Sequence, residues 1–245
     1  MPEILLCGAE GEQFLFENAL TIEGADDKRR GSVVLTAGQQ MFRQFSTSYN
    51  DFWVHFRCAP FDQIQANRDA GVLMTVTAGT TLVARVSAVA SGGNTVNFTF
   101  DAASSNGTMI TGPMLPHPMG EFINYDIRIQ TAGTTRTVSF YRNEVLRYTV
   151  SYEDIAWTAP DSVLFQSRTN DADEDDMHYQ DIIITDALPT VGMELATLVP
   201  SAVGNFSDFT NDYTAIDDFG YDQSTVMSTT TANTRESWFF ADPEF

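Results

Sequence analysis

Apolar and polar residues alternate strictly in the stretch from Glu121 to Thr149. Between residues 123 and 130 every second side chain is apolar, which places four apolar groups on one face of a strand and four polar ones on the other. The segment 137–141 continues the pattern, and the apolar run 145–148 follows it; short breaks with turn-like composition separate the three segments. The stretch therefore predicts three consecutive antiparallel strands, whose apolar face must be covered by a second sheet.

Short runs of the same character occur on both sides of this meander. Residues 52–58 alternate clearly until Pro60 ends the run. No stretch of a dozen residues has a helical period and no internal repeat is visible, so the chain is expected to be an all-β, two-sheet antiparallel sandwich. The other predicted strands are residues 4–7, 32–36, 71–76, 82–87, 96–100, 163–166 and 182–184, whereas the proline-bearing segment 104–120 is expected to be a loop.

The alternation also predicts which side chains form the core of the sandwich. On each strand, the apolar members of the alternating pattern share one face, which must point toward the opposite sheet. The predicted core residues are Phe52, Val54, Phe56, Ile123, Tyr125, Ile127, Ile129, Val138, Phe140, Ile182 and Ile184.

The pattern changes after Asp186, and this change predicts a sandwich over residues 1–186 followed by a C-terminal extension over 187–245. The extension is too aromatic for a linker and too weakly periodic for a second domain. Its aromatic side chains are expected to be buried against another subunit, which would make the extension an assembly arm; alternatively, they pack back onto their own sandwich as extra strands. The predicted assembly contacts are Phe206, Phe209, Tyr213, Phe219, Tyr221, Trp238, Phe239, Phe240 and Phe245.

Net charge excludes some partners. The chain has 33 acidic and 13 basic residues, for a formal net charge of -20. Binding to nucleic acid or to an anionic membrane needs clustered cations, so neither is an expected partner. The first residues contain no basic leader and only a short apolar run, so neither a signal peptide nor a transmembrane segment is expected.

Catalytic patterns are missing from the sequence, so no enzymatic activity is expected. The carboxylate spacing of glucanases does not occur, and neither does a nucleophile elbow, a zinc-type histidine pair or a phosphate loop. The histidines His55, His117 and His178 lie in different segments. Cys7 and Cys58 permit one disulfide without requiring it, and their apolar surroundings favour buried free thiols.

An acidic run at residues 171–176 resembles the start of a calcium-binding loop. Asp171, Asp173 and Asp175 alternate and are the candidate ligands. The pattern then fails, because Asp176 occupies the position that needs glycine and Ile182 the one that needs glutamate. A solvated loop is therefore the preferred interpretation, with no cofactor expected and calcium as the alternative.

Several motifs together resemble a known family. They are Phe52-Trp53-Val54-His55-Phe56, the strand segments 124–129 and 137–143, and the run Tyr179 to Asp186, which has the Asp-hydrophobic-hydrophobic-hydrophobic-x-Asp pattern from Asp181. In this order they resemble concanavalin A-like jelly rolls of laminin G type, and more narrowly the version in virion proteins of tailed bacteriophages. Asn143-Glu144 stands where those relatives usually have Asn-Gly. The resemblance implies a virion structural role and supplies no catalytic residue.

Two functions follow as hypotheses. The preferred one is a structural component of a phage virion, decorating the capsid or associated with the tail, made in the host cytoplasm and contacting other virion proteins and copies of itself. The alternative is a carbohydrate-binding module for a host or environmental glycan. Lectin sites use exposed aromatic side chains beside polar loops, so Tyr152 and Trp157, or the 104–120 segment, are the candidate glycan contacts.

Overall fold

The computed structural model describes residues 3–8, 15–17, 21–23, 32–35, 39–60, 71–90, 95–153, 158–167, 177–193, 200–207 and 236–240, with side chains described only between residues 32 and 193. These residues contain strands and no helix, and so no helix that could cross a membrane. The chain divides into two compact units. The first, called the sandwich unit here, comprises residues 1–23 and 32–193; the second comprises residues 24–31 and 194–245.

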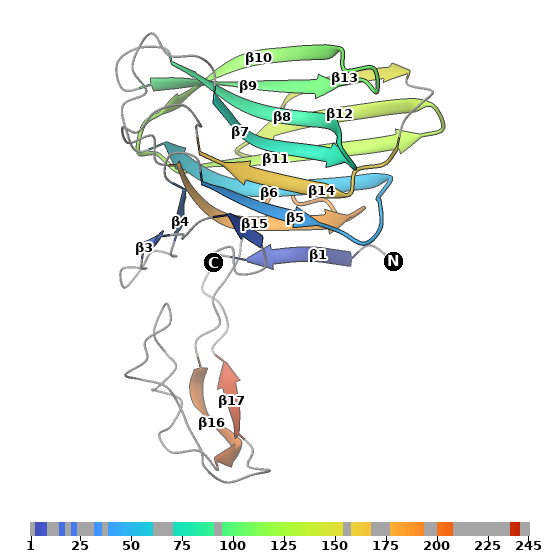
Figure 1. Ribbon diagram of the computed structural model, residues 1–245. Coiled ribbons are helices and arrows are strands. Elements are labelled where there is room, and N and C mark those ends of the chain that lie inside the picture. Colours follow the sequence, from blue (N-terminus) through green and yellow to red (C-terminus); the bar gives the residue numbers. More distant parts are fainter. Residues whose placement is uncertain are drawn as a thin grey trace. The chain divides into compact units, whose positions relative to one another are not determined.

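Two antiparallel sheets form the sandwich unit, as Figure 1 shows. Sheet A has the order β13-β12-β11-β6-β15-β4-β3, and β1 also pairs with β15. Sheet B has the order β10-β9-β8-β7-β14-β5-β2. The strands of sheet A are β1 (Glu3–Gly8), β3 (Thr21–Glu23), β4 (Ser32–Leu35), β6 (Asp51–Pro60), β11 (Ile123–Ala132), β12 (Thr135–Arg142), β13 (Val145–Glu153) and β15 (Met177–Asp186). Those of sheet B are β2 (Leu15–Glu17), β5 (Gln40–Gln44), β7 (Gly71–Ala78), β8 (Thr81–Ala90), β9 (Thr95–Ala103), β10 (Met109–Pro118) and β14 (Ser162–Gln166).

The two-sheet sandwich and its predicted core are confirmed. All eleven predicted core residues are at most 5% exposed and belong to one hydrophobic cluster between the sheets. Aromatic rings join the two layers: Phe56 of sheet A contacts Phe165 of sheet B, with ring centroids 5.4 Å apart. Cys58 is buried in this core as a free thiol, and burial raises its pKa, so it acts as a small apolar side chain.

The predicted loop at 104–120 is wrong for residues 109–118, which form β10 at the edge of sheet B. Proline is tolerated at an edge because an outward-facing position needs no donor, and the pairing with β9 is interrupted between Thr111 and Met114. Within that interruption, a Cβ on Gly112 would lie 2.4 Å from the carbonyl oxygen of Phe100 and 2.7 Å from the ring of Tyr148. Only glycine allows this close approach of β10 to β13.

The turn between β12 and β13 has positive φ at both central residues, 46° at Asn143 and 65° at Glu144. This is the backbone of a two-residue type I′ hairpin turn, which favours Asn-Gly. Glutamate therefore occupies a strained position here. The Asn143 side chain compensates in part, since its Oδ1 accepts a hydrogen bond of 3.2 Å from the backbone N–H of Asn124.

The sandwich unit continues to Met193, seven residues beyond the predicted end of the sandwich at Asp186. In the second unit, β16 (Pro200–Ser207) pairs antiparallel with β17 (Glu236–Phe240). The assembly arm stays a prediction. Of its aromatic residues, Phe206, Trp238, Phe239 and Phe240 lie in these two strands, whose side chains are not described, and Phe209, Tyr213, Phe219, Tyr221 and Phe245 lie outside the described residues.

A buried histidine connects β10 to the core. His117 is fully buried, and its Nε2 lies 2.8 Å from the carbonyl oxygen of Glu121, so this nitrogen carries the hydrogen. Its Nδ1 therefore accepts the hydrogen bond from the Tyr125 hydroxyl, at 2.8 Å. Burial lowers the pKa of His117 from 6.5 to about 4, so the imidazole is neutral in the folded protein at neutral pH.

Replacing Ile127 by alanine tests the assignment of the core face. Ile127 is fully buried, so Ile127→Ala is expected to lower the free energy of unfolding by about 2–5 kcal/mol, measured by urea denaturation. Thr111→Ala, at an exposed position of β10, is the control and is expected to change it by less than about 0.5 kcal/mol. Equal effects of the two substitutions would contradict the assignment.

His117 also predicts a pH dependence of stability. Between pH 6.5 and about 4 the unfolded chain binds a proton at this histidine and the folded chain does not, so stability falls as the pH falls through this range. Above pH 6.5 the difference in proton binding between the folded and unfolded chain contributes its full amount to the free energy of unfolding, roughly 3 kcal/mol. His117→Leu removes it and should flatten the curve of unfolding free energy against pH, whereas Phe98→Leu, beside the imidazole, should lower the curve without flattening it. Parallel curves for wild type and His117→Leu would refute this assignment.

Candidate functional site

The outer face of sheet A carries a band of polar and aromatic side chains, called the sheet A band here. It arises from the alternation that builds the core, since Trp53 and His55 alternate with buried apolar residues of β6. The strand register places Trp53 opposite Arg128 and His55 opposite Asp126, and it places Asp126 opposite Tyr141 on β12. Side chains from three neighbouring strands are thereby brought together.

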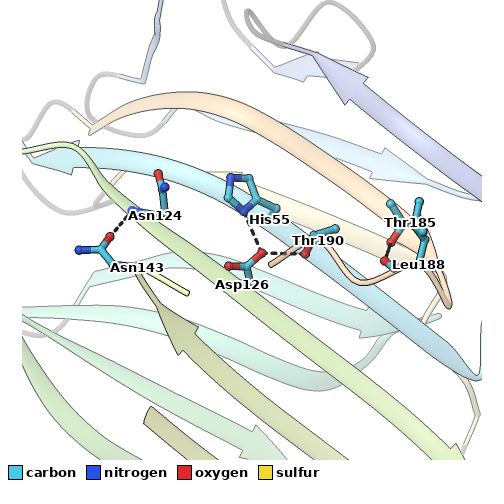
Figure 2. Close-up of polar contacts among 7 residues, drawn as sticks. All are labelled: His55, Asn124, Asp126, Asn143, Thr185, Leu188 and Thr190. Atoms are coloured by element: carbon cyan, nitrogen blue, oxygen red, sulfur yellow. Dashed lines mark hydrogen bonds and ion pairs between the residues drawn. The ribbon is translucent and has the colours of Figure 1, made fainter. Parts of the chain in front are cut away.

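Asp126 is the centre of the buried part of this band. Its Oδ1 accepts a hydrogen bond of 2.8 Å from Nδ1 of His55 and another of 2.7 Å from the hydroxyl of Thr190, as Figure 2 shows. All three side chains are at most 1% exposed. The carboxylate therefore ties β6 and β11 to the segment 187–193.

The segment 187–193 follows β15 and packs onto the outer face of sheet A. The backbone N–H of Ala187 donates to the carbonyl of Asp51 over 2.7 Å, and the Thr185 hydroxyl donates to the Leu188 carbonyl. Thr190 then supplies the contact to Asp126. A segment predicted to begin the C-terminal extension is thus part of the sandwich unit and covers the buried half of the band.

The accessible part of the sheet A band is an array of hydrogen-bonded polar side chains. Arg128 donates two hydrogen bonds to the Asp51 carboxylate, of 2.9 and 2.7 Å, and Gln130 adds a third of 3.3 Å. The hydrogen bonds from Arg128 to Asp51 raise the pKa of the guanidinium. Arg128 also lies over the Trp53 ring, 4.9 Å from its centroid, and Tyr141 lies 5.8 Å away from the same ring. The side chains of Arg128 and Asp51 are 28% and 24% exposed, so this half of the band faces solvent.

Two buried polar atoms in the band have no hydrogen-bond partner among the described residues. They are Nε1 of Trp53, a donor, and Oδ2 of Asp126, an acceptor. The Trp53 ring reaches both Arg128 and Tyr141, so it lies across β11 beside Asp126. Each unsatisfied buried group costs about 1–3 kcal/mol, and such groups are rare enough to require an explanation.

The outer face of sheet B carries a smaller cluster. Asp101 on β9 accepts a hydrogen bond of 2.8 Å from Arg85 on β8 through one carboxylate oxygen, and its other oxygen has no partner. The hydroxyl of Ser87 on β8, 3% exposed, also has none. This cluster has no aromatic side chain among its members, in contrast to the sheet A band.

The structure does not join Tyr152 and Trp157 into a described site, because Trp157 lies outside the described residues. The Tyr152 hydroxyl donates to the Ala103 carbonyl over 2.6 Å, and its ring lies against the buried Arg136 guanidinium. Tyr152 therefore connects the two sheets, and its role in glycan binding stays a prediction. The candidate calcium ligands Asp171, Asp173 and Asp175 lie outside the described residues.

The pairing of His55 with Asp126 resembles part of a catalytic triad. The Asp126 carboxylate orients His55 as it would orient a catalytic base, but the Thr190 hydroxyl bonds to the carboxylate and not to the imidazole. In the part of the chain that the structure describes, His55 therefore has no nucleophile beside it. His178, 5% exposed, bonds to the Ser32 hydroxyl at 3.1 Å, far from His55 in the sequence and on another strand.

Comparisons with known proteins identify the architecture. No protein-family model and no curated protein sequence matches the chain. Among solved structures, the receptor-binding domain of botulinum neurotoxin C/D mosaic serotype is similar with a TM-score of 0.53 and 13% identity, over 75% of this chain and 43% of that one. The receptor-binding domain of botulinum neurotoxin D has a TM-score of 0.52 and 11% identity, over 79% of this chain and 50% of that one.

A third structure, of botulinum neurotoxin type C, is described as showing that cell entry depends on interaction with two ganglioside molecules. It has a TM-score of 0.53 and 10% identity, over 80% of this chain and 50% of that one. The chain thus spans half or less of the length of these structures. At such low identity the likeness shows the fold alone, and the fold is an antiparallel β-sandwich of the jelly-roll type.

Proposed function

We propose that this protein is a non-catalytic glycan-binding module and that the sheet A band is its binding face. The observation that carries the proposal is the partly exposed array of Asp51, Arg128 and Gln130, which lies beside the rings of Trp53 and Tyr141. A sugar hydroxyl group matches such an array, because it can donate to a carboxylate and accept from a guanidinium or amide N–H. Glycans are the ligands that present hydroxyl groups at high density.

The accessible half of the band provides the elements that such a ligand requires. The hydrogen bonds within the array of Asp51, Arg128 and Gln130 hold its donors and acceptors in fixed orientation. Tyr141, partly exposed beside Trp53, offers a ring face for the apolar C–H side of a sugar. Because the array is fixed by hydrogen bonds within the protein, little side-chain entropy is lost when a ligand binds.

The comparisons support the class of ligand. The botulinum neurotoxin type C structure is described as interacting with gangliosides, which are glycolipids, and it shares the jelly-roll sandwich. The other two named structures are also described as receptor-binding domains. This supports a module that recognises a glycan on a surface.

The virion structural role rests on the sequence resemblance and stays a prediction, as does a location in the phage particle. The described contacts of the sandwich unit do not bear on it. The two functions are compatible, because a glycan-binding sandwich can be carried on a larger assembly.

Glycan-array screening of the full chain tests the proposal, followed by calorimetric titration of the best ligand. Tyr141→Ala is expected to weaken binding roughly tenfold through loss of the ring contact, and Trp53→Phe to weaken it because the smaller ring gives less support to Arg128 and Tyr141. Thermal unfolding must show that both variants are folded.

Two matched controls locate the site. Asp101→Asn changes the cluster on sheet B, and Glu121→Gln removes an exposed carboxylate away from the band; neither is expected to change the affinity. An array without any hit would overturn the proposed function. Loss of binding in Asp101→Asn with full binding in Tyr141→Ala would move the site to sheet B.

A further inference from the structure

The edge strands of the two sheets differ in how far they are protected against pairing with another chain. β2 and β3 have only three residues each. β10 carries Pro113, Pro116 and Pro118 and an interruption in its pairing, and β1 is a six-residue strand with an irregularity between Ile4 and Leu6. Short length, proline and bulges are the devices by which proteins block edge-to-edge association.

β13 has one of these devices, a register shift in its pairing with β12 between Leu146 and Tyr148, and its pairing is regular from Tyr148 to Glu153. It is nine residues long, contains neither proline nor lysine, and pairs only with β12 among the described strands. Val145 and Leu146 at its start are each 50% exposed. A long edge that contains one basic and one acidic residue and pairs regularly from Tyr148 to Glu153 is a template for a further strand.

The inner face of β13 is also incompletely covered. Tyr148, Val150 and Tyr152 point toward sheet B and pack against the hydrophobic core, but each remains partly exposed. The core of the sandwich thus extends to this edge without being closed there. An added strand would bury these side chains further, which is favourable in proportion to the apolar area removed from water.

We propose that β13 pairs antiparallel with β13 of a second copy of this chain, so that sheet A becomes continuous across a twofold-symmetric dimer. Antiparallel pairing of identical strands is self-complementary, since each contact occurs twice. The register centred on Val150 places Arg147 of each copy opposite Glu153 of the other. These two residues are the only charged ones in β13, and both are exposed.

Charge selects both the partner and the register. Two copies with a formal net charge of -20 each repel one another over most of their surfaces. The β13 edge is neutral as a whole, so it is a favourable place for two copies to approach. In the register centred on Val150, the two cross-strand ion pairs are formed; a shift by two residues would separate Arg147 from Glu153 and lose both.

The same register matches the remaining side chains. Thr149 comes opposite Ser151 on the outer face, and Tyr148 comes opposite Tyr152 on the inner face, where aromatic pairs are favourable. In such a dimer the outer faces of both copies of sheet A lie on the same side. Two sheet A bands on one side could bind a glycan-bearing surface together, which would raise the avidity of the proposed glycan binding. The dimer itself does not depend on the glycan-binding proposal.

Sedimentation equilibrium of the full chain tests the dimer through a charge exchange. Wild type is expected to form a concentration-dependent dimer. Arg147→Glu and Glu153→Arg should each weaken it roughly tenfold or more, because like charges then face each other twice across the interface. The double variant Arg147→Glu with Glu153→Arg restores both ion pairs and is expected to recover the wild-type dimerisation constant.

Met114→Lys is the matched control, because Met114 is 54% exposed on the other long edge, β10, and the proposed interface does not include it. It should leave dimerisation unchanged. A wild-type chain that is monomeric at every concentration overturns the proposal, and so does a dimer whose stability is the same in both single variants. Neither result affects the glycan array, so the two proposals fail independently.

Discussion

The contact between the two sheets at Phe56 and Tyr125 is the interaction on which the rest of the structure depends. These residues lie opposite each other on β6 and β11, with ring centroids 5.6 Å apart. Phe56 reaches Phe165 of sheet B, and Tyr125 reaches Phe98 and Phe100, at 5.5 and 5.7 Å. Large rings at the centre of both layers set the separation of the sheets and bury the apolar face of every long strand.

The candidate binding face is a consequence of the same pairing. Because successive side chains of a strand point to opposite faces, the register that puts Phe56 opposite Tyr125 inside the core also puts His55 opposite Asp126 outside it. A register shift of one residue would turn the side chains of the band into the core and the core side chains to the outer face. The polar groups of the band are therefore held in place by the packing of the core, which is the support that a preorganised binding site needs.

The polar contacts at the rim of the core explain how the sandwich tolerates buried polar groups. Arg136 is among the largest fully buried side chains, and it donates to the Ala103 carbonyl over 2.9 Å. His117 is kept neutral by burial and is hydrogen-bonded through both nitrogens. Each of these groups links a strand of sheet A to a strand of sheet B, so hydrogen bonds close the sides that apolar packing leaves open.

The amino-acid sequence by itself determined the class of fold and the core, because a period of two specifies a strand face without knowledge of its partner. The eleven alternating apolar residues, from Phe52 to Ile184, are all buried. Strand β10 was missed, because local composition at Pro113, Pro116 and Pro118 predicts a loop and only an edge position makes those prolines acceptable.

Tertiary structure alone decided the site and the edge position of β13. Trp53, Asp126 and Thr190 are separated by up to 137 positions in the chain, and they meet only because β6, β11 and the segment after β15 are neighbours in one layer. No local pattern encodes which strands become neighbours, since pairing depends on the free energy of the whole core. Likewise, nothing in the sequence of β13 marks it as an edge, because a strand becomes an edge only through the order of the others in the sheet.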